Sequence, residues 1–120
     1  GHVRGVGTLH PLMSFTRTET APDLYGAAFA IEGDEAACAM AEKLVTFMGG
    51  RKLRLGAKAL PLYHAGAVVA SNYVVALVDL ARQLLEDVGV SPSDATAALV
   101  PLLRSVANNL ETAGLPDALT

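Results

Sequence analysis

The chain has few of the residues that stabilise disulfide-bonded or metal-bound folds. It contains one cysteine, Cys38, three histidines and no tryptophan among 120 residues. A single cysteine excludes an internal disulfide, and histidines at unrelated positions do not make a zinc site, so we expect no metal. Cys38 lies in an alanine-rich stretch and is expected to be a small buried hydrophobe. A free thiol fits a reducing compartment and no signal peptide is visible, so we expect a cytoplasmic protein.

Charged residues are also scarce, at 18% of the chain against 52% hydrophobic residues. So apolar a composition excludes extended disorder and predicts that part of the surface is buried against another copy or another domain. The net charge of −3 argues against a nucleic-acid partner. The sequence has one basic cluster, formed by Arg51, Lys52, Arg54 and Lys58. We interpret this cluster as a solvated edge of the protein rather than as a phosphate site.

Phosphate-binding motifs are absent as well. The sequence has no G-x-G-x-x-G fingerprint and no P-loop. Gly5-Val6-Gly7 precedes a predicted strand, whereas the glycines of a dinucleotide site follow one. We therefore expect no cofactor on this chain alone.

The first half of the sequence does predict an order of elements, which is strand, loop, strand, helix, strand. The strands are expected at residues 3–9, 27–31 and 51–55, and Asp34 is expected to cap a helix over residues 36–48. This order favours parallel strands joined by a helical crossover. Three strands and one helix are too few for a complete doubly wound domain, so the segment is interpreted as the second half of one.

The second half is predicted to be helical. One long helix is expected from Pro61 to about Val88, and another opens near Ser91. Pro101 is expected to kink or restart the second helix. The apolar run from Leu60 to Leu85 raises the question of a membrane span. Its polar residues favour a buried or interface helix, so we expect no membrane partner and a homodimer.

Three polar residues, His64, Ser71 and Asn72, interrupt this apolar run. A seven-residue step returns to nearly the same helix face, so His64 and Ser71 are expected almost in line, with Asn72 adjacent. Inside a buried helix such groups need partners in the protein or in a ligand. An imidazole can exchange protons near neutral pH, and Ser and Asn can orient a substrate. A core histidine with satisfied hydrogen bonds is the alternative.

Two further residues are candidates. His10 is expected at the C-terminal end of a parallel strand that Pro11 ends, and ligands of open α/β sheets collect at such ends. A structural role at the end of the strand is equally open for His10. Asn109 would approach the same cavity if the two helices pack antiparallel, although a capping role fits an Asn near a helix end equally well.

Several linked segments resemble a known bacterial family over essentially the whole chain. These segments are Leu9-His10-Pro11-Leu12 through Phe15, Ile31-Glu32-Gly33-Asp34, Tyr63-His64-Ala65 to Ser71-Asn72-Tyr73, Pro101-Leu102 to Asn109, and Ala118-Leu119-Thr120. They are similar to Rossmann-like proteins with a C-terminal domain of unknown function, DUF2520. That family is similar to 6-phosphogluconate dehydrogenase, pyrroline-5-carboxylate reductase and ketopantoate reductase.

The resemblance implies the architecture. Such proteins have an N-terminal NAD(P)-binding domain and a C-terminal helical domain that commonly dimerises. Residues 1–57 would be the last strands and helix of a Rossmann-like α/β sheet. Residues 58–120 would be an all-α domain, similar to the C-terminal domain of 6-phosphogluconate dehydrogenase, that serves dimerisation and substrate binding.

The resemblance also implies residue roles. Ketopantoate reductases carry Lys-x-x-x-Asn-x-x-x-Asn on their first long C-terminal helix, and His64, Val68 and Asn72 fall at that spacing. His64 would replace the catalytic Lys, and Asn72 would keep one Asn. His10-Pro11 is similar to the His-Pro motif of prephenate dehydrogenases, in which the His contacts the substrate hydroxyl.

The expected function is therefore the C-terminal part of an NAD(P)-dependent oxidoreductase for a small carbonyl, imine or hydroxy substrate. His64 and Asn72 would be catalytic. His10, Ser71 and Asn109 would bind the substrate, and His10 and Pro11 would lie at the cofactor. The chain is not expected to be active alone. The alternative is a non-catalytic helical dimerisation module or a small-ligand binding protein.

Overall fold

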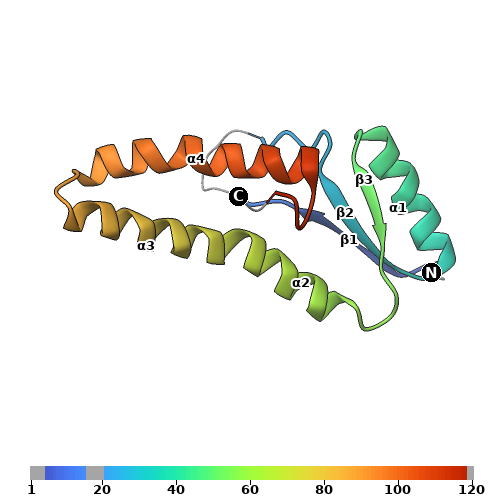
Figure 1. Cartoon of the computed structure of the whole chain (residues 1–120). Coiled ribbons are helices and arrows are strands. Elements are labelled where there is room, and N and C mark those ends of the chain that lie inside the picture. Colours follow the sequence, from blue (N-terminus) through green and yellow to red (C-terminus); the bar gives the residue numbers. More distant parts are fainter. Residues whose placement is uncertain (1–4, 16–20, 119–120) are drawn as a thin grey trace. The chain divides into compact units, whose positions relative to one another are not determined.

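The computed structural model describes residues 5–15 and 21–118. In chain order its elements are β1 (Gly7–Leu12), β2 (Ala28–Gly33), α1 (Glu35–Phe47), β3 (Arg51–Arg54), α2 (Leu60–Val68), a π-helical turn η1 (Val69–Tyr73), α3 (Val74–Asp87) and α4 (Pro92–Ala113). Figure 1 shows the small sheet followed by the long helices. The predicted fold class, an α/β segment followed by helices, is confirmed.

The chain divides into two compact units, Gly1–Ser71 and Asn72–Thr120. The first unit contains the sheet, α1 and α2, and the second contains α3 and α4. The boundary between the units falls inside the long helix, whereas the sequence places a domain boundary at residues 57–58. That domain boundary stays a prediction.

The sheet has the strand order β1-β2-β3. β2 and β3 are parallel and are connected through α1, as predicted. The prediction that β1 is parallel to its neighbour is wrong, because β1 pairs with β2 in the antiparallel direction. A parallel connection needs a crossover, usually a helix, and the described part of the β1–β2 connection contains none.

Pro11 does not end β1, which continues to Leu12. Pro11 lies opposite Phe29 in the ladder. Among the described residues β1 is an edge strand, so the missing N–H of a proline can face away from the sheet at no cost in ladder bonds. His10 is consequently a mid-strand residue, and the prediction that it lies at the end of a parallel strand is wrong.

The core of the first unit lies between the sheet and α1. Phe29, Ile31, Cys38 and Val45 are its buried members, with Leu9 packed against them. The prediction for Cys38 is confirmed, since the side chain is 2% exposed. Of the two expectations for the long helix, buried or at an interface, the first is wrong within this chain, because α2, η1 and α3 contain no buried residue.

The helix starts follow the sequence signals. The Asp34 carboxylate accepts a hydrogen bond from the N–H of Ala37 at 3.0 Å, and the Ser91 hydroxyl accepts one from the N–H of Asp94 at 3.2 Å. Each contact satisfies a free N–H of a first helical turn. Pro101 lies inside a single helix, so the predicted restart of the second helix is wrong.

Gly33 fixes the junction between β2 and α1. Its φ is 144°, and a Cβ there would lie 2.5 Å from the carbonyl oxygen of Val6 and even closer to the Cα of Gly7. We expect Gly33→Ala to lower the free energy of unfolding by more than about 2 kcal/mol, because it adds a backbone clash to an unfavourable φ.

Gly26→Ala is the matched control for this substitution. Gly26 also has a positive φ, 74°, but a Cβ there meets nothing within 4 Å. Backbone strain alone should then lower the stability by about 1 kcal/mol. Urea unfolding of both variants measures the difference, and equal losses would show that the close approach of β1 to Gly33 is not as described.

The second unit is a helical hairpin that leaves apolar side chains exposed. α3 and α4 pack on each other after a turn at Gly89, whose φ is 92°. One stripe stays more than half exposed. It begins at Tyr73 at the end of η1, at 58%, runs along α3 through Leu77 at 65%, Leu80 at 53% and Leu84 at 60%, and ends at Val88 directly after α3, at 76%. Spacings of three and four residues place this stripe on one helix face.

The continuous helix Leu60–Asp87 is long and apolar enough to cross a membrane, since an 18-residue window within it has a mean hydropathy of 1.4. One such helix is weak evidence, because it rests on length and composition alone.

Candidate functional site

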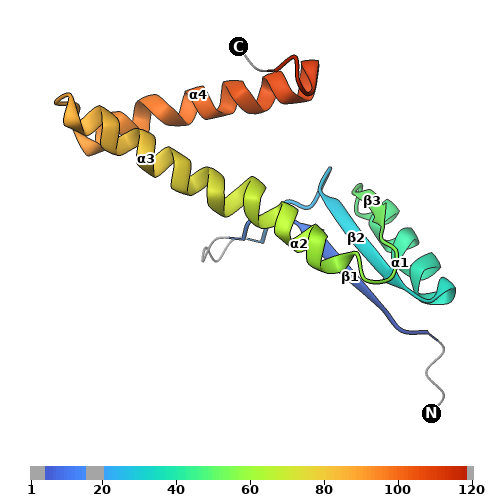
Figure 2. The same cartoon turned by 60° about the horizontal axis from the view of Figure 1, so that its bottom comes forward.

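The sheet of the first unit has two differently used faces. Phe29 and Ile31 point to α1, so by the alternation of a strand Ala30 points to the opposite face. His10 and Leu53 are the register partners of Ala30 on the two neighbouring strands, so they share that face. Figure 2 shows α2 on this side of the sheet, away from α1. His10 therefore lies near α2 because its side chain is on this face of the sheet, and not because it is at the end of a strand.

Three rings from β1 and α2 form a cluster at this face. The His10 and His64 ring centroids lie 4.9 Å apart with the planes at 87°. Tyr63 lies 5.9 Å from His10 and 5.6 Å from His64, also edge-to-face. The Tyr63 hydroxyl donates a hydrogen bond of 3.4 Å to the carbonyl oxygen of His10. Two histidines that the sequence analysis proposed separately thus share one site.

The two imidazoles of this cluster are exposed, and the phenol is partly buried. The exposure of His64 argues against the alternative of a core histidine. Burial raises the pKa of the Tyr63 phenol above its ordinary value, because the charged phenolate loses solvation. Tyr63 is consequently a neutral hydrogen-bond donor over the physiological range, and solvent or a substrate can reach His10 and His64.

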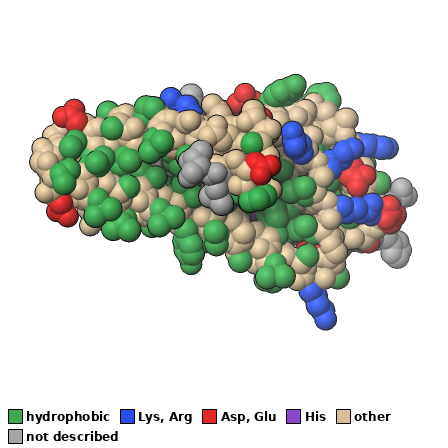
Figure 3. Space-filling view, viewed as in Figure 1, with side chains coloured by type: hydrophobic (Ala, Val, Ile, Leu, Met, Phe, Trp, Pro, Cys, Tyr) green, Lys and Arg blue, Asp and Glu red, His purple; other side chains and the backbone are tan. Residues whose placement is uncertain are grey.

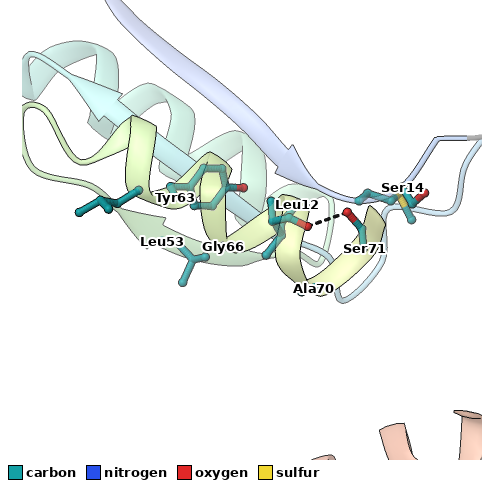
Figure 4. Close-up of a pocket in the computed structure, with 10 residues that line it drawn as sticks. Leu12, Ser14, Leu53, Tyr63, Gly66, Ala70 and Ser71 are labelled. Atoms are coloured by element: carbon teal, nitrogen blue, oxygen red, sulfur yellow. Dashed lines mark hydrogen bonds between the residues drawn. The ribbon is translucent and has the colours of Figure 1, made fainter. Parts of the chain in front are cut away.

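A pocket of about 510 Å³ adjoins the cluster through Tyr63 (Figure 4). The strand side contributes Leu12, Met13, Ser14 and Leu53, and the helix side contributes Leu62, Tyr63, Gly66, Ala67, Ala70 and Ser71. No lining residue carries a charge, and the polar side chains are the hydroxyls of Ser14, Ser71 and Tyr63. Its volume lies within the range of small-molecule sites.

Ser71 lies in η1 and lines this pocket together with Tyr63, whereas His64 does not line it. The alignment of Ser71 with His64 on one helix face stays a prediction. The Ser71 hydroxyl donates to the carbonyl oxygen of Ala67 at 2.6 Å, the dashed line in Figure 4. Such i−4 bonds compete with the backbone ladder, and π turns recur at functional sites.

The remaining candidates lie elsewhere. Asn72 follows Ser71 in η1 and Asn109 lies in α4, both in the second unit and both exposed. Pro11 is half-buried beside His10 in β1. Their roles stay predictions. Sequence reasoning missed Tyr63 as a site residue, although its position directly before His64 was a usable signal.

The N-terminus of α1 carries a carboxylate where a pyrophosphate would need to bind. Asp34 accepts hydrogen bonds from the N–H groups of Ala37 and Val6, at 3.0 and 2.6 Å. These bonds lower the pKa of the Asp34 carboxyl, with the larger effect from Ala37. A βα junction that is already occupied by an anion is a poor phosphate site.

The basic cluster is also engaged in part. Arg54 forms ion pairs with Glu35 at 2.5 Å and with Glu42 at 3.4 Å, both on α1. The interpretation as a solvated edge fits the exposed side chains of β3. Across residues 5–15 and 21–118, no group of three or more His, Cys, Asp or Glu is arranged to hold a metal ion.

Comparison with known proteins identifies the class. The model of the family described as "Domain of unknown function (DUF2520)" matches residues 27–120. This chain belongs to that family. No curated protein matches the chain.

Solved structures share the fold over most of the chain. Protein TM1727 from Thermotoga maritima is 26% identical with a TM-score of 0.79, covering 95% of this chain and 45% of that one. The putative NADP oxidoreductase BF3122 from Bacteroides fragilis is 21% identical with a TM-score of 0.72, and the match covers 100% of this chain and 45% of that one. Pyrroline carboxylate reductase from Plasmodium falciparum, solved with NADP bound, is 12% identical with a TM-score of 0.62, and the match covers 76% of this chain and 38% of that one. The chain thus spans less than half the length of these structures.

Proposed function

We propose that this chain is the C-terminal substrate-binding and dimerisation part of an NAD(P)-dependent oxidoreductase that acts on a small carbonyl, imine or hydroxy substrate. The observation that carries the proposal is the edge-to-face contact of His10 and His64 at 4.9 Å on an exposed face. Residues 54 positions apart in the chain supply two proton-exchanging groups at one point beside an apolar pocket. The likeness to structures named as NADP-dependent proteins supports the class of reaction.

In this site His64 exchanges the proton that the reacting oxygen or nitrogen of the substrate gains or loses. His10 supports that imidazole edge-on and meets the substrate polar group from the strand side. Tyr63, held neutral by burial, anchors α2 to the backbone of β1. NAD(P), when bound, supplies or accepts the hydride. Ser71 is proposed to orient the substrate. Asn72 and Asn109, which belong to the second unit, stay predictions as a catalytic and a substrate-binding residue.

The cofactor phosphates would bind outside this chain. The residues here fit the reacting end of NAD(P), because His10 and Pro11 are adjacent on β1 and His10 is exposed. They do not fit the pyrophosphate, because the Asp34 carboxylate occupies the N-terminus of α1. The open edge of β1 and an apolar groove from Gly5 to Leu44 would receive the rest of the sheet.

Isothermal titration of this chain alone with NADPH is therefore expected to show no binding. The phosphates contribute most of the charge that a protein recognises in such a cofactor, and their site lies elsewhere. Sub-millimolar affinity for this chain would contradict the proposal.

We also propose that α3 and α4 form a homodimer in the cytoplasm. Figure 3 shows hydrophobic side chains gathered over these helices. An exposed apolar stripe of this length is the usual mark of an interface. If the site proved inert, the helical hairpin would still fit the alternative of a dimerisation module.

A screen for NAD(P)H oxidation, using the longer protein that contains this chain and a panel of small aldehydes, ketones and imines, tests the function. Turnover with at least one class, lost in His64→Ala, is the expected result. Turnover unchanged in both His64→Ala and Asn72→Ala would remove the proposed roles.

A further inference from the structure

The lining of the pocket beside the histidine pair indicates which chemical group the unreactive part of the substrate carries. None of its ten lining residues is charged, and most are aliphatic or alanine and glycine. Placing a carboxylate or phosphate in such a lining would strip its hydration without a compensating cation. An uncharged apolar group loses nothing of this kind and gains from leaving water.

The shape of the pocket comes from small residues on one wall. Gly66, Ala67 and Ala70 lie on the helix side, opposite Leu12 and Leu53 of the sheet. A Cβ added at Gly66 would meet nothing within 4 Å, so the space in front of it is open. The pocket is thus hollowed between two rigid elements of the same unit.

The pocket and the proposed reacting site have one residue in common. Tyr63 both lines the pocket and contacts the rings of His10 and His64. A molecule with its polar reacting atom at the imidazoles would direct its other end past Tyr63 into the apolar space. Ser14 and Ser71 offer uncharged hydroxyls at the rim of that space.

We propose that this pocket binds the neutral, apolar end of the substrate, so that the protein acts on small molecules with an aliphatic group rather than on those with a second carboxylate or a phosphate. This inference rests on the proposed function in one respect only, which is that the reacting end of the substrate lies at the histidines. The binding of an apolar group in the pocket is a property of this chain and can be measured without catalysis.

Two unreactive probes of nearly equal shape test the proposal by titration into the chain, followed in ¹H–¹⁵N NMR spectra. One is 4-methylpentanamide, which ends in an isopropyl group, and the other is succinamate, which ends in a carboxylate. We expect the isopropyl probe to shift the amide signals of Gly66 and Ser71 and to bind at least about tenfold more tightly than succinamate. Equal binding of the two probes, or no binding of the isopropyl probe, would overturn the proposal.

Gly66→Leu locates the binding. The new side chain extends into open space, and replacing glycine inside a helix favours the helix, so the variant is expected to fold. Its affinity for 4-methylpentanamide should fall at least about tenfold. Ala65→Leu, one residue earlier and outside the lining, is the matched control and should bind as the parent does.

The variants also separate the other possible occupants. If Gly66→Leu changed the oligomeric state in light scattering and the probe did not bind the parent chain, the pocket would hold a second copy, against the proposal. If the probe bound as expected while the longer protein showed no oxidoreductase activity, the pocket would stand and the proposed function would fail. If the longer protein were active but Gly66→Leu did not change the affinity for the probe, the proposal for the pocket would be refuted and the proposed function would not.

Discussion

Replacing His64 with alanine in the longer protein is expected to lower kcat by roughly a hundred- to ten-thousandfold, the usual contribution of a general acid or base. The reason is geometric, because His64 meets the ring of His10 at 4.9 Å on an exposed face. Steady-state NAD(P)H oxidation with the best substrate of the screen measures the change. The affinity for NAD(P)H should stay the same, since in the proposed function the cofactor phosphates would bind outside this chain.

Imidazole added to the buffer provides the control for this variant. Because His64 is exposed, a free imidazole can enter the space that the alanine leaves. We expect it to restore part of kcat in His64→Ala and to leave the parent protein unaffected. A loss of rate that imidazole does not restore, together with altered circular dichroism, would indicate a structural role for His64.

Replacing Leu80 with glutamate is expected to raise the dissociation constant of the proposed dimer at least about a hundredfold. Leu80 lies in the middle of the exposed stripe on α3 and is 53% exposed in the single chain. A symmetric interface contains the substitution twice, and each copy loses apolar burial and places a carboxylate among apolar side chains. Light scattering over a dilution series, or sedimentation equilibrium, measures the constant.

Gln83→Glu is the matched control on the same helix. It adds the same charge at an exposed position outside the stripe, where the Gln83 amide bonds to the Asp79 carboxylate. Its dimer should dissociate as the parent does, apart from a small effect of two like charges. Equal weakening by Leu80→Glu and Gln83→Glu, or a parent chain that is monomeric at micromolar concentration, would contradict the proposed interface.

Local signals in the sequence predicted the elements well. The cap at Asp34, the start of a helix near Ser91 and the burial of Cys38 are all as expected, because each depends on residues within one turn or one face. The pairing of β2 with β3 also follows from the helix between them. The direction of β1 was missed because it depends on the route of a loop that has no periodicity to read.

The contact between His10 and His64 was not predicted from the sequence, and their roles stay predictions. His10 and His64 were both chosen, but the expected reason for His10 was a strand end, whereas it is the face of the sheet on which α2 lies. The grouping of Ser71 with Tyr63 depends on where α2 and η1 pass the pocket, and an ideal helical wheel does not contain that information.

The most direct test of the central claim is an NMR titration of the two imidazole side chains in the longer protein with NADP⁺. If His10 and His64 form one site at the reacting end of the cofactor, both imidazole signals shift together and saturate at the same NADP⁺ concentration. Saturable binding of NADP⁺ that leaves both imidazole signals in place would contradict the account.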